Sequence, residues 1–370
     1  MSKTIRMLLL GLVGAFALSS TGTALAAYTS PSLRVTDDRS SVTIRYTVSG
    51  SDDPTAKLTF YAPTGYTASL NAAAGTTLGT VTAQGTAADL GGALLPLTGT
   101  VQARAANGTF TSAPGGQPTP LTAGATQCTG TPTHTAYWVL ILQAAGQTLE
   151  LPVYVDAPAA PPAPGASASA FASASIQACL PPPDLPTGTP GRATFGFKLT
   201  QVDFKVNGVF TSGGTGQPRW RTLATPYTPN TGRPNAAGSV EVQSVIAFPR
   251  TLRLNRPTLR SANGFTTLNL RGAQQLPAGA ASTIRLYRGK TAGGLSPSVT
   301  LSKAGAAFRG TLRIRQTTKA QVVFLQARAV VSAGTDTCTA TFGVPCLRTT
   351  RAAVNVRTGT VRVVIPARKK

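Results

Sequence analysis

Arginines in the C-terminal third of the chain alternate with apolar residues over short segments. One phase of residues 309–319 holds Arg309, Arg313, Arg315 and Lys319. The opposite phase holds Leu312 and Ile314. Successive side chains of a β-strand point to opposite faces of the sheet, so these cations are expected to face away from the core. Arg357 and Arg362 stand in the same relation to the valines around them.

A sheet face covered with guanidinium groups would bind polyanions. Guanidinium pairs with phosphate and carboxylate groups through charge-assisted hydrogen bonds, and several together generate a positive field. We expect one outward face to include Arg313, Arg315, Arg357 and Arg362, with the Arg368-Lys369-Lys370 tail adding to the field. The expected partner is an anionic cell-wall polymer or an acidic polysaccharide. Specific nucleic-acid binding is not expected, because no RNA- or DNA-binding motif is evident.

Charge is distributed very unevenly along the chain. Residues 27–156 hold five basic and seven acidic residues, a net charge of −2. Residues 250–370 hold 21 basic residues and one acid, Asp336, a net charge of +20. This far exceeds the net charge of about 2–8 that suits the surface of a small soluble domain. The alternative interpretation is a basic surface that serves only solubility.

The signatures of common exported hydrolases are missing. The chain has one histidine, His134, and no HExxH, GxSxG or SxxK motif. A Ser-His-Asp triad through His134 stays open, because geometry and not spacing defines a triad. A pair of carboxylates for glycoside hydrolysis also stays open among the 11 acidic residues. We expect a non-catalytic protein without a cofactor.

Cysteine spacing favours disulfides over a metal site. The four cysteines have no CxxC spacing, and the one histidine, His134, lies six residues from Cys128, which does not match a zinc site. Of the three pairings, we expect Cys338 with Cys346 across a short loop, which leaves Cys128 with Cys179. The acidic pairs Asp37-Asp38 and Asp52-Asp53 would suit a calcium loop or simple turns, and we expect turns.

Trp220 lies between Arg219 and Arg221 and has two interpretations. With Tyr227 it would form an aromatic platform for a sugar. Alternation instead directs the indole into the core and the arginines outward. We expect a core tryptophan, and the platform remains the basis of an alternative function.

The N-terminus has the form of a secretory signal. A basic start, an apolar run and the Ala24-Leu25-Ala26 site predict cleavage after residue 26. No later segment is apolar enough to span a membrane. We therefore expect a secreted, extracellular protein, either released or associated with the cell wall.

The elements that carry these residues are expected to be strands. Alternation of apolar and polar residues recurs throughout, and 38 glycines and 28 prolines favour short strands and tight turns. We expect an all-β fold of two or three immunoglobulin-like β-sandwich domains in tandem after the signal peptide. The expected segments are the signal peptide 1–26, an N-terminal β-sandwich 27–156, a Pro/Ala/Ser linker 157–169, a second β-rich domain 170–249 and a basic C-terminal β-sandwich 250–370. Residues 354–363 are expected to form a hairpin around Thr358-Gly359.

Three short strings carry a resemblance. They are YAPTGY at 61–66, CLPPP at 179–183 and TPYTPN at 225–230. The chain resembles exported immunoglobulin-like β-sandwich proteins of GC-rich actinobacteria, a group without a known activity. The resemblance implies export and β-sandwich architecture, and it carries over no active site.

These observations favour a non-catalytic exported or cell-surface protein whose basic C-terminal domain binds anionic polymers through charge. The first alternative is a carbohydrate- or protein-binding adhesion module that uses the first two domains. The second is a hydrolase with an unrecognised carboxylate pair. The sequence does not indicate the oligomeric state.

Overall fold

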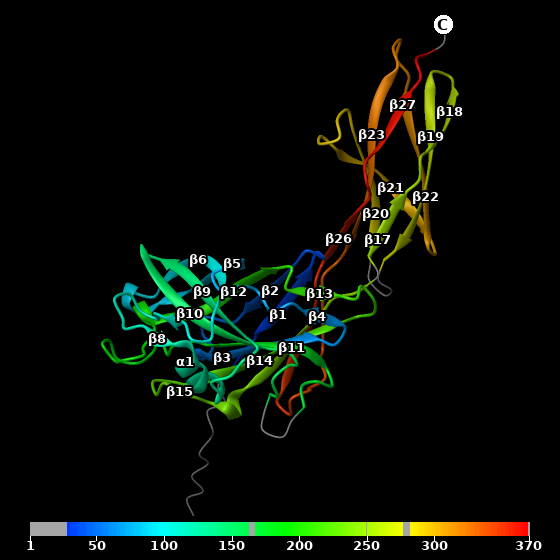
Figure 1. Ribbon diagram of the computed structural model, residues 1–370. Helices are drawn as coiled ribbons and strands as arrows, with labels where there is room; N and C mark the ends of the chain where they lie inside the picture. The colour runs from blue at the N-terminus through cyan, green and yellow to red at the C-terminus, as the bar shows by residue number, and fades with distance from the viewer. Residues whose placement is uncertain (1–27, 163–166, 249, 277–281, 369–370) are drawn as a thin grey trace, which may run out of the picture.

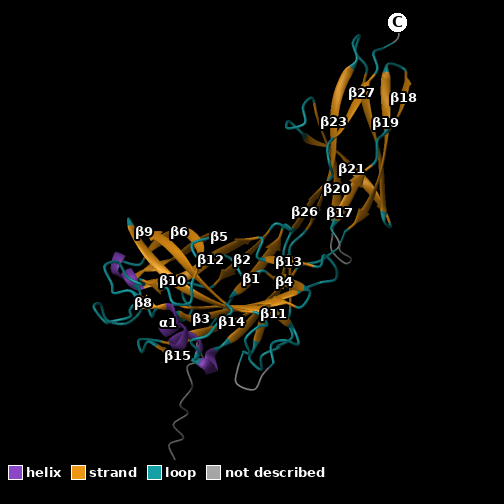
Figure 2. Ribbon diagram, in the orientation of Figure 1, coloured by secondary structure: helices purple, strands orange, loops and turns teal. Residues whose placement is uncertain are grey.

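The computed structural model describes residues 28–162, 167–248, 250–276 and 282–368. The expected signal peptide lies outside the described residues. Strands account for 56% of the structure and helices for 5%, which confirms the all-β prediction. The strands form two bodies (Figures 1 and 2). The N-terminal domain comprises residues 28–248 and 332–353, and the distal sandwich comprises residues 250–331 and 354–368.

The elements of the N-terminal domain follow one another along the chain through residue 245, and two more strands return from beyond the distal sandwich. The first ten strands are β1 (Ser32–Asp37), β2 (Ser41–Thr47), β3 (Thr55–Pro63), β4 (Tyr66–Ala68), β5 (Thr77–Ala87), β6 (Ala93–Arg104), β7 (Thr109–Phe110), β8 (Thr119–Pro120), β9 (Ala136–Ala144) and β10 (Gln147–Asp156). The remaining strands are β11 (Ala172–Cys179), β12 (Phe197–Asn207), β13 (Phe210–Ser212), β14 (Arg219–Thr228), β15 (Arg233–Pro234), β16 (Val240–Val245), β24 (Gly334–Asp336) and β25 (Cys346–Arg351). The helical elements are η1 (Ala88–Leu90), α1 (Leu121–Thr129), η2 (Thr194–Gly196) and η3 (Ala236–Gly238).

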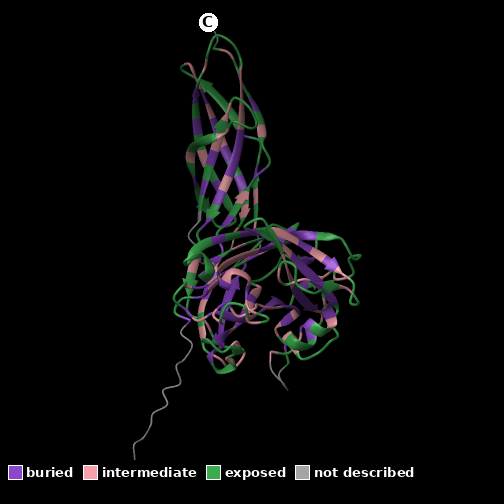
Figure 3. Ribbon diagram, turned by 90° about the vertical axis from the view of Figure 1, so that its left-hand side faces the viewer, coloured by how far each residue is buried: buried purple, intermediate pink, exposed green. Residues whose placement is uncertain are grey.

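One large sheet builds the N-terminal domain and curls upon itself. Its strand order is β1-β2-β12-β5-β6-β9-β10-β11-β3-β14-β16-β25-β24. The curl brings β1 against β16 and β25. Val35 N–H donates to Ser244 Oγ at 2.8 Å, and the Thr350 hydroxyl donates to Leu33 O. Buried residues of these strands form one hydrophobic core, and they are drawn in purple in Figure 3.

The predicted division into domains 27–156 and 170–249 is wrong. Strand β12 lies between β2 and β5, and strand β3 lies between β11 and β14. The two segments therefore share a sheet, and they share one hydrophobic core that extends from Tyr28 to Phe248. Alternation predicted strands in both segments, but alternation does not encode which strands pair.

The predicted linker 157–169 is likewise not an interdomain linker. It connects β10 to β11, which pair directly with each other through Val153–Asp156 and Ser175–Ala178. Ala160 N–H donates to Ser175 Oγ at 3.0 Å, and Ala159 and Ala168 are buried. Proline and alanine content predicts a stiff connection, but this one joins neighbouring strands of one sheet.

Helix α1 was not predicted from the sequence. It has nine residues and ends at Gly130, whose φ of 81° is the left-handed conformation that favours glycine at a helix C-terminus. A Cβ atom on Gly124 would lie 2.5 Å from the Tyr154 hydroxyl, so only glycine lets the helix pack this closely on β10. Small residues on the buried side weaken the apolar stripe that usually reveals a helix.

Within its described residues, 250–276, 282–331 and 354–368, the distal sandwich has nine strands. They are β17 (Thr251–Leu254), β18 (Thr258–Ala262), β19 (Phe265–Gln275), β20 (Ser282–Gly289), β21 (Ser296–Ala304), β22 (Ala307–Arg315), β23 (Gln321–Val331), β26 (Val354–Arg357) and β27 (Val361–Ile365). β17, β18, β19 and β22 form one layer, and β20, β23, β26 and β27 form the other. β21 pairs with β20 in the second layer and, through its last residues, with β22 in the first. Leu268, Leu312, Ile284 and Leu325 are among the buried side chains between the layers.

The predicted hairpin around Thr358-Gly359 is wrong. β26 and β27 both pair with β23, one after the other, and continue in the same direction. Thr358 is buried, donates its N–H to Ala327 O at 2.9 Å and accepts Ala327 N–H through its hydroxyl at 3.1 Å. These bonds hold the Thr-Gly step against β23 instead of allowing it to reverse the chain.

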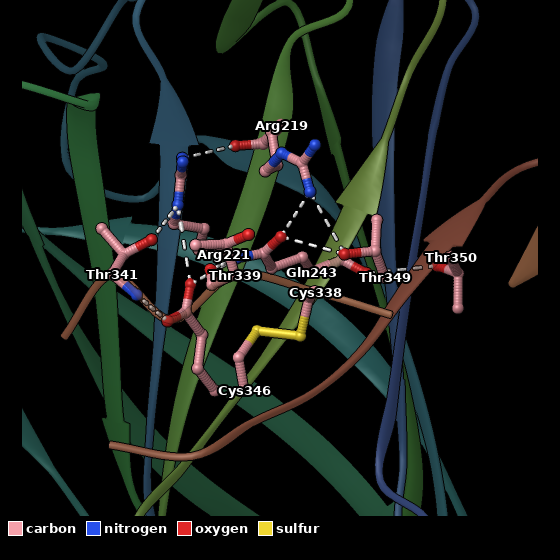
Figure 4. The surroundings of a disulfide bond; sticks show 10 residues. Arg219, Arg221, Gln243, Cys338, Thr339, Thr341, Cys346, Thr349 and Thr350 are labelled. Carbon is pink, nitrogen blue, oxygen red and sulfur yellow. Dashed lines mark hydrogen bonds and ion pairs between the residues drawn. A yellow bond between two sulfur atoms is a disulfide. The ribbon is translucent and has the colours of Figure 1, made fainter. Parts of the chain in front are cut away.

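The chain returns to the N-terminal domain between its two visits to the distal sandwich. β25 runs parallel to β16, and the Cys338–Cys346 disulfide closes the loop before it (Figure 4). Glu241 is fully buried and accepts Thr341 N–H at 2.6 Å and Gln243 Nε2–H at 2.7 Å. Arg221 Nε lies 3.6 Å from the Glu241 carboxylate. The returning segment is thus fastened to the N-terminal domain by a buried charge and its partners.

Candidate functional site

Six arginines project from the outer side of the first layer of the distal sandwich. We call this set the β22 face; it comprises Arg253, Arg260, Arg271, Arg309, Arg313 and Arg315. Arg271 lies directly opposite Arg309 on the neighbouring strand. Two rows along on the same side of the layer, Thr267 lies between Arg260 and Arg313. All six are exposed, and for all but Arg260 at least one neighbouring position of the opposite phase is buried in the core.

Four arginines project from the outer side of the second layer. We call this set the β23 face; it comprises Arg285, Arg328, Arg357 and Arg362. Arg285 lies opposite Arg328, and Arg328 lies opposite Arg357. These three cations therefore form a row across three adjacent strands. Side chains directly opposite in an antiparallel pair have Cβ atoms about 4.5–5.5 Å apart. Three guanidinium groups therefore share a narrow strip of surface.

The two faces lie on opposite sides of the sandwich. The prediction of one face holding Arg313, Arg315, Arg357 and Arg362 is therefore wrong. Arg313 and Arg315 lie together on the β22 face with Arg309, whereas Arg357 and Arg362 lie on the β23 face. Parity along a strand separates inward from outward positions, but it does not say to which layer the strand belongs.

Four of the predicted residues lie outside both faces or outside the described residues. Lys319 lies in the connection between β22 and β23 and belongs to neither face. Arg368 N–H donates to Thr317 O, which fastens the last described residues beside that connection. The tail residues Lys369 and Lys370 lie outside the described residues.

Sequence reasoning missed five of the arginines. Arg253, Arg260, Arg271, Arg285 and Arg328 had a usable signal, because most alternate with apolar residues that are now seen to be buried. Arg285, for example, stands between Ile284 and Leu286. The rows of facing arginines carried no such signal, because they depend on the pairing register.

Aromatic rings position two of the guanidinium groups. Arg313 Cζ lies 4.1 Å from the centre of the Phe265 ring, and Arg328 Cζ lies 4.1 Å from the centre of the Tyr287 ring. Arg328 Nε also donates to Gln326 Oε1 at 2.7 Å. A guanidinium stacked on a ring keeps its N–H edges free for an anion while losing little side-chain freedom on binding.

The sequence of the distal sandwich supplies no side-chain carboxylate to offset these charges. Residues 250–331 and 354–368 contain 17 basic residues and neither Asp nor Glu. Counterions for the two arginine faces must come from solvent, from a ligand or from another part of the chain. This composition suits reversible binding of multivalent anions.

His134 lies in a buried arrangement with the outline of a triad. Its Nδ1 atom is 2.9 Å from Asp156 Oδ2, and its Nε2 atom is 2.9 Å from Thr129 Oγ1. Thr129 Oγ1 also lies 2.9 Å from Ala125 O, an acceptor within helix α1. The imidazole is 1% exposed and packs against the Tyr154 ring. This geometry connects the end of α1 to β10, and a threonine occupies the place of a nucleophilic serine.

The remaining candidates resolve into structural roles. Trp220 is fully buried with edge-on contacts to Tyr66 and Phe210, so its interpretation as a core residue is confirmed. Asp38 accepts Ser40 N–H and Ser41 N–H, as a turn residue does. Asp52 accepts Thr29 N–H and Ser49 N–H. Within the described ranges, no group of three or more His, Cys, Asp or Glu side chains is placed to hold a metal ion.

Both predicted disulfides are confirmed. Cys128 is bonded to Cys179, and Cys338 is bonded to Cys346. The first was expected to cross a linker between two domains. It instead joins the end of helix α1 to the end of β11 inside one domain.

Comparison with known proteins adds no relative. No protein-family model matches the chain, and searches of curated proteins and of solved structures give no match. In the part of the chain that the structure describes, no helix is long and apolar enough to cross a membrane.

Proposed function

We propose that the distal sandwich binds polyanions and that the protein is an exported, non-catalytic component of the cell surface or its surroundings. The observation that carries this proposal is the row Arg285–Arg328–Arg357. Like charges directly opposite in a sheet destabilise it. An anion placed over the row replaces this repulsion with charge-assisted hydrogen bonds.

The two faces suit a long and repetitive ligand. Each face presents cations over several strands, and the faces point away from each other. One molecule can therefore contact two segments of polymer at once, and linked contacts raise the overall affinity above that of either face. An anionic cell-wall polymer or an acidic polysaccharide has the required length and charge density.

The finer points of architecture and compartment belong to the same proposal. Two disulfides are consistent with an oxidising compartment such as the exterior of a cell. The two-layered distal body, in which β21 pairs with both layers, supports an immunoglobulin-like assignment. Export through residues 1–26 completes the proposal.

The proposal is tested with two triple variants of the full-length protein. The first changes Arg285, Arg328 and Arg357 to Gln. The second removes the same charge from other exposed positions of the distal sandwich, by changing Arg288, Lys290 and Lys319 to Gln. Affinity for heparin and for teichoic acid is measured by calorimetry at several salt concentrations.

The row variant is expected to lose at least tenfold more affinity than the charge-matched variant. Its logarithmic salt dependence should also become shallower, by about one unit for each anionic group of the polymer that the row no longer binds. Equal losses in the two variants would show that total charge, and not the arginine row, governs binding. Affinity that does not change with salt would refute a charge-based function altogether.

A further inference from the structure

The curled sheet of the N-terminal domain forms an apolar cavity that is partly open to solvent. Its volume is about 130 Å³, and it is lined from seven adjacent strands, β12, β5, β6, β9, β10, β11 and β3. Leucine, isoleucine and phenylalanine dominate the wall; Leu58, Phe60, Leu140, Leu142, Ile176 and Phe204 are examples. A well-packed protein interior contains few spaces larger than a water molecule, so a cavity of this size is a candidate ligand-binding site.

Among the described residues that line the cavity, one side chain is charged, and that charge is already satisfied. Glu150 lines the cavity, but its Oε1 atom lies 3.0 Å from Arg104 Nη2. Its Oε2 atom accepts Thr111 N–H at 2.8 Å. A charged ligand would find no free counter-charge here, so the cavity selects an uncharged and apolar one.

The connection from β11 to β12, residues 180–196, forms part of the cavity wall. We call it the lid segment; it contributes Leu180, Pro181, Ala193, Thr194 and Phe195 to the lining. Phe195 has φ 59° and ψ 13°, a left-handed conformation that is uncommon for a bulky residue. Such strain persists where surrounding contacts enforce it.

An ion pair joins the lid segment to the connection between β5 and β6. Arg192 donates to both oxygens of Asp89 at 2.7 Å, and its Nε donates to Leu185 O. Asp89 belongs to η1, between β5 and β6. The pair spans 103 residues of sequence and joins the β5–β6 connection to the lid segment.

We propose that this cavity is a binding site for a small, uncharged alkyl or aryl group, and that the lid segment controls its entry. The volume sets the size of ligand that fits, because an engineered apolar cavity of about 150 Å³ in another protein stays dry and binds benzene. Filling the space restores packing contacts to the residues that line it. The site is independent of the arginine faces, which lie in the other body.

The test uses fluorobenzene as the probe and the full-length protein. Binding is followed by fluorine NMR, and the melting temperature is followed in parallel. The protein is expected to bind saturably and to melt at a higher temperature with the probe. Ala83→Leu, in the wall, should reduce affinity at least tenfold, whereas Ala273→Leu, exposed on the distal sandwich, should leave it unchanged.

Because Ala83→Leu could disturb folding, a second wall variant enlarges the space. Leu142→Ala should keep the affinity for fluorobenzene and gain binding of butylbenzene, which the unmodified protein excludes. The proposal would be overturned if neither the unmodified protein nor Leu142→Ala bound the probe saturably. Binding that Ala83→Leu leaves intact, in a folded protein, would also overturn the assignment to this cavity.

The role of the lid segment has its own control. Asp89→Asn removes the ion pair with Arg192, and Asp203→Asn removes a similar two-bond ion pair with Arg45 on the same domain. Asp89→Asn should raise the rates of probe entry and exit at least threefold with little change in affinity. Equal rates in the two variants would contradict control by the lid segment.

Discussion

The two bodies of this protein use charge in opposite ways. The N-terminal domain has 13 basic and 11 acidic residues, and ion pairs such as Arg104–Glu150 and Arg45–Asp203 join its separate strands. The distal sandwich has 17 basic residues and no side-chain carboxylate. The first body can use ion pairs to stabilise its fold. In the second, apolar packing must hold the fold, and the arginines of the two faces are available to a ligand.

The same contrast extends to covalent links. Both disulfides lie in the N-terminal domain, and the sequence of residues 250–331 and 354–368 contains no cysteine. The N-terminal domain has long connections and a sheet whose neighbours are distant in sequence. Crosslinks offset the entropy cost of ordering such a topology.

Removing the Cys128–Cys179 disulfide by two alanine substitutions should have the largest effect. Its closed loop spans 51 residues, and loop entropy predicts a loss of about 4 kcal/mol of unfolding free energy. Removing Cys338–Cys346, which spans 8 residues, should cost about 2.5 kcal/mol. Hydrogen exchange resolved by peptide should show faster exchange in the N-terminal domain, residues 28–248 and 332–353. Faster exchange confined to the distal sandwich would contradict this contrast between the two bodies.

Glu241→Ala should destabilise the N-terminal domain by about 3 kcal/mol, because it leaves Arg221 without its carboxylate in a largely buried setting. It also leaves Thr341 N–H without an acceptor. Glu241→Gln keeps an acceptor in place and should cost less. Urea unfolding of the two variants measures the difference. An alanine variant as stable as the unmodified protein would show that the buried charge does not fasten the returning segment.

Acid should affect the two bodies differently. The Arg192 guanidinium lowers the pKa of Asp89, and hydrogen bonds from Ser41 and Ser40 lower that of Asp38 by more than its partial burial raises it. A carboxyl group with a lowered folded-state pKa stabilises the fold above its unfolded value of 3.8. This contribution is lost as the pH falls through the folded-state pKa.

The N-terminal domain should therefore lose stability below about pH 4. The distal sandwich, without side-chain carboxylates, should keep its stability there. Calorimetric melting at pH 3 and pH 6, with hydrogen exchange to assign the transitions, checks this prediction. Asp89→Asn should remove part of the pH dependence, and a distal transition that shifts as much as the N-terminal one would contradict it.

How much of this arrangement the sequence predicts depends on the range of the interaction. Alternation placed β2, β9, β10 and β22, because each strand has its own inward and outward phase. It could not place β12 between β2 and β5, since such pairing depends on residues more than a hundred positions apart. For the same reason, the sequence alone led to the incorrect prediction that Arg313 and Arg357 share one face.

The cavity and helix α1 illustrate a second limit. Leu58, Leu140 and Ile176 have the sequence pattern of core residues whether or not the core is completely filled. Helix α1 depends on Gly124 meeting Tyr154, a contact that local propensity does not contain. The disulfides were predictable because four cysteines allow few pairings.

Arg285→Gln should have the smallest effect on stability and the opposite sign. It removes one cation from the row with Arg328 and should raise the unfolding free energy of the distal sandwich by about 0.5 kcal/mol at low salt. The gain should shrink as salt screens the repulsion. Denaturant titration at two salt concentrations measures it. A loss of stability at low salt would mean that the facing arginines do not repel.

The most direct test of the central claim is a footprint of a bound polyanion on the full-length protein. Hydrogen exchange with and without heparin, at low salt, should show protection in residues 282–289, 321–331 and 354–357, which carry the β23 face. Peptides of the N-terminal domain should exchange at the same rate in both conditions. Protection centred on the N-terminal domain, or none anywhere while heparin is bound, would contradict the assignment of binding to the distal sandwich.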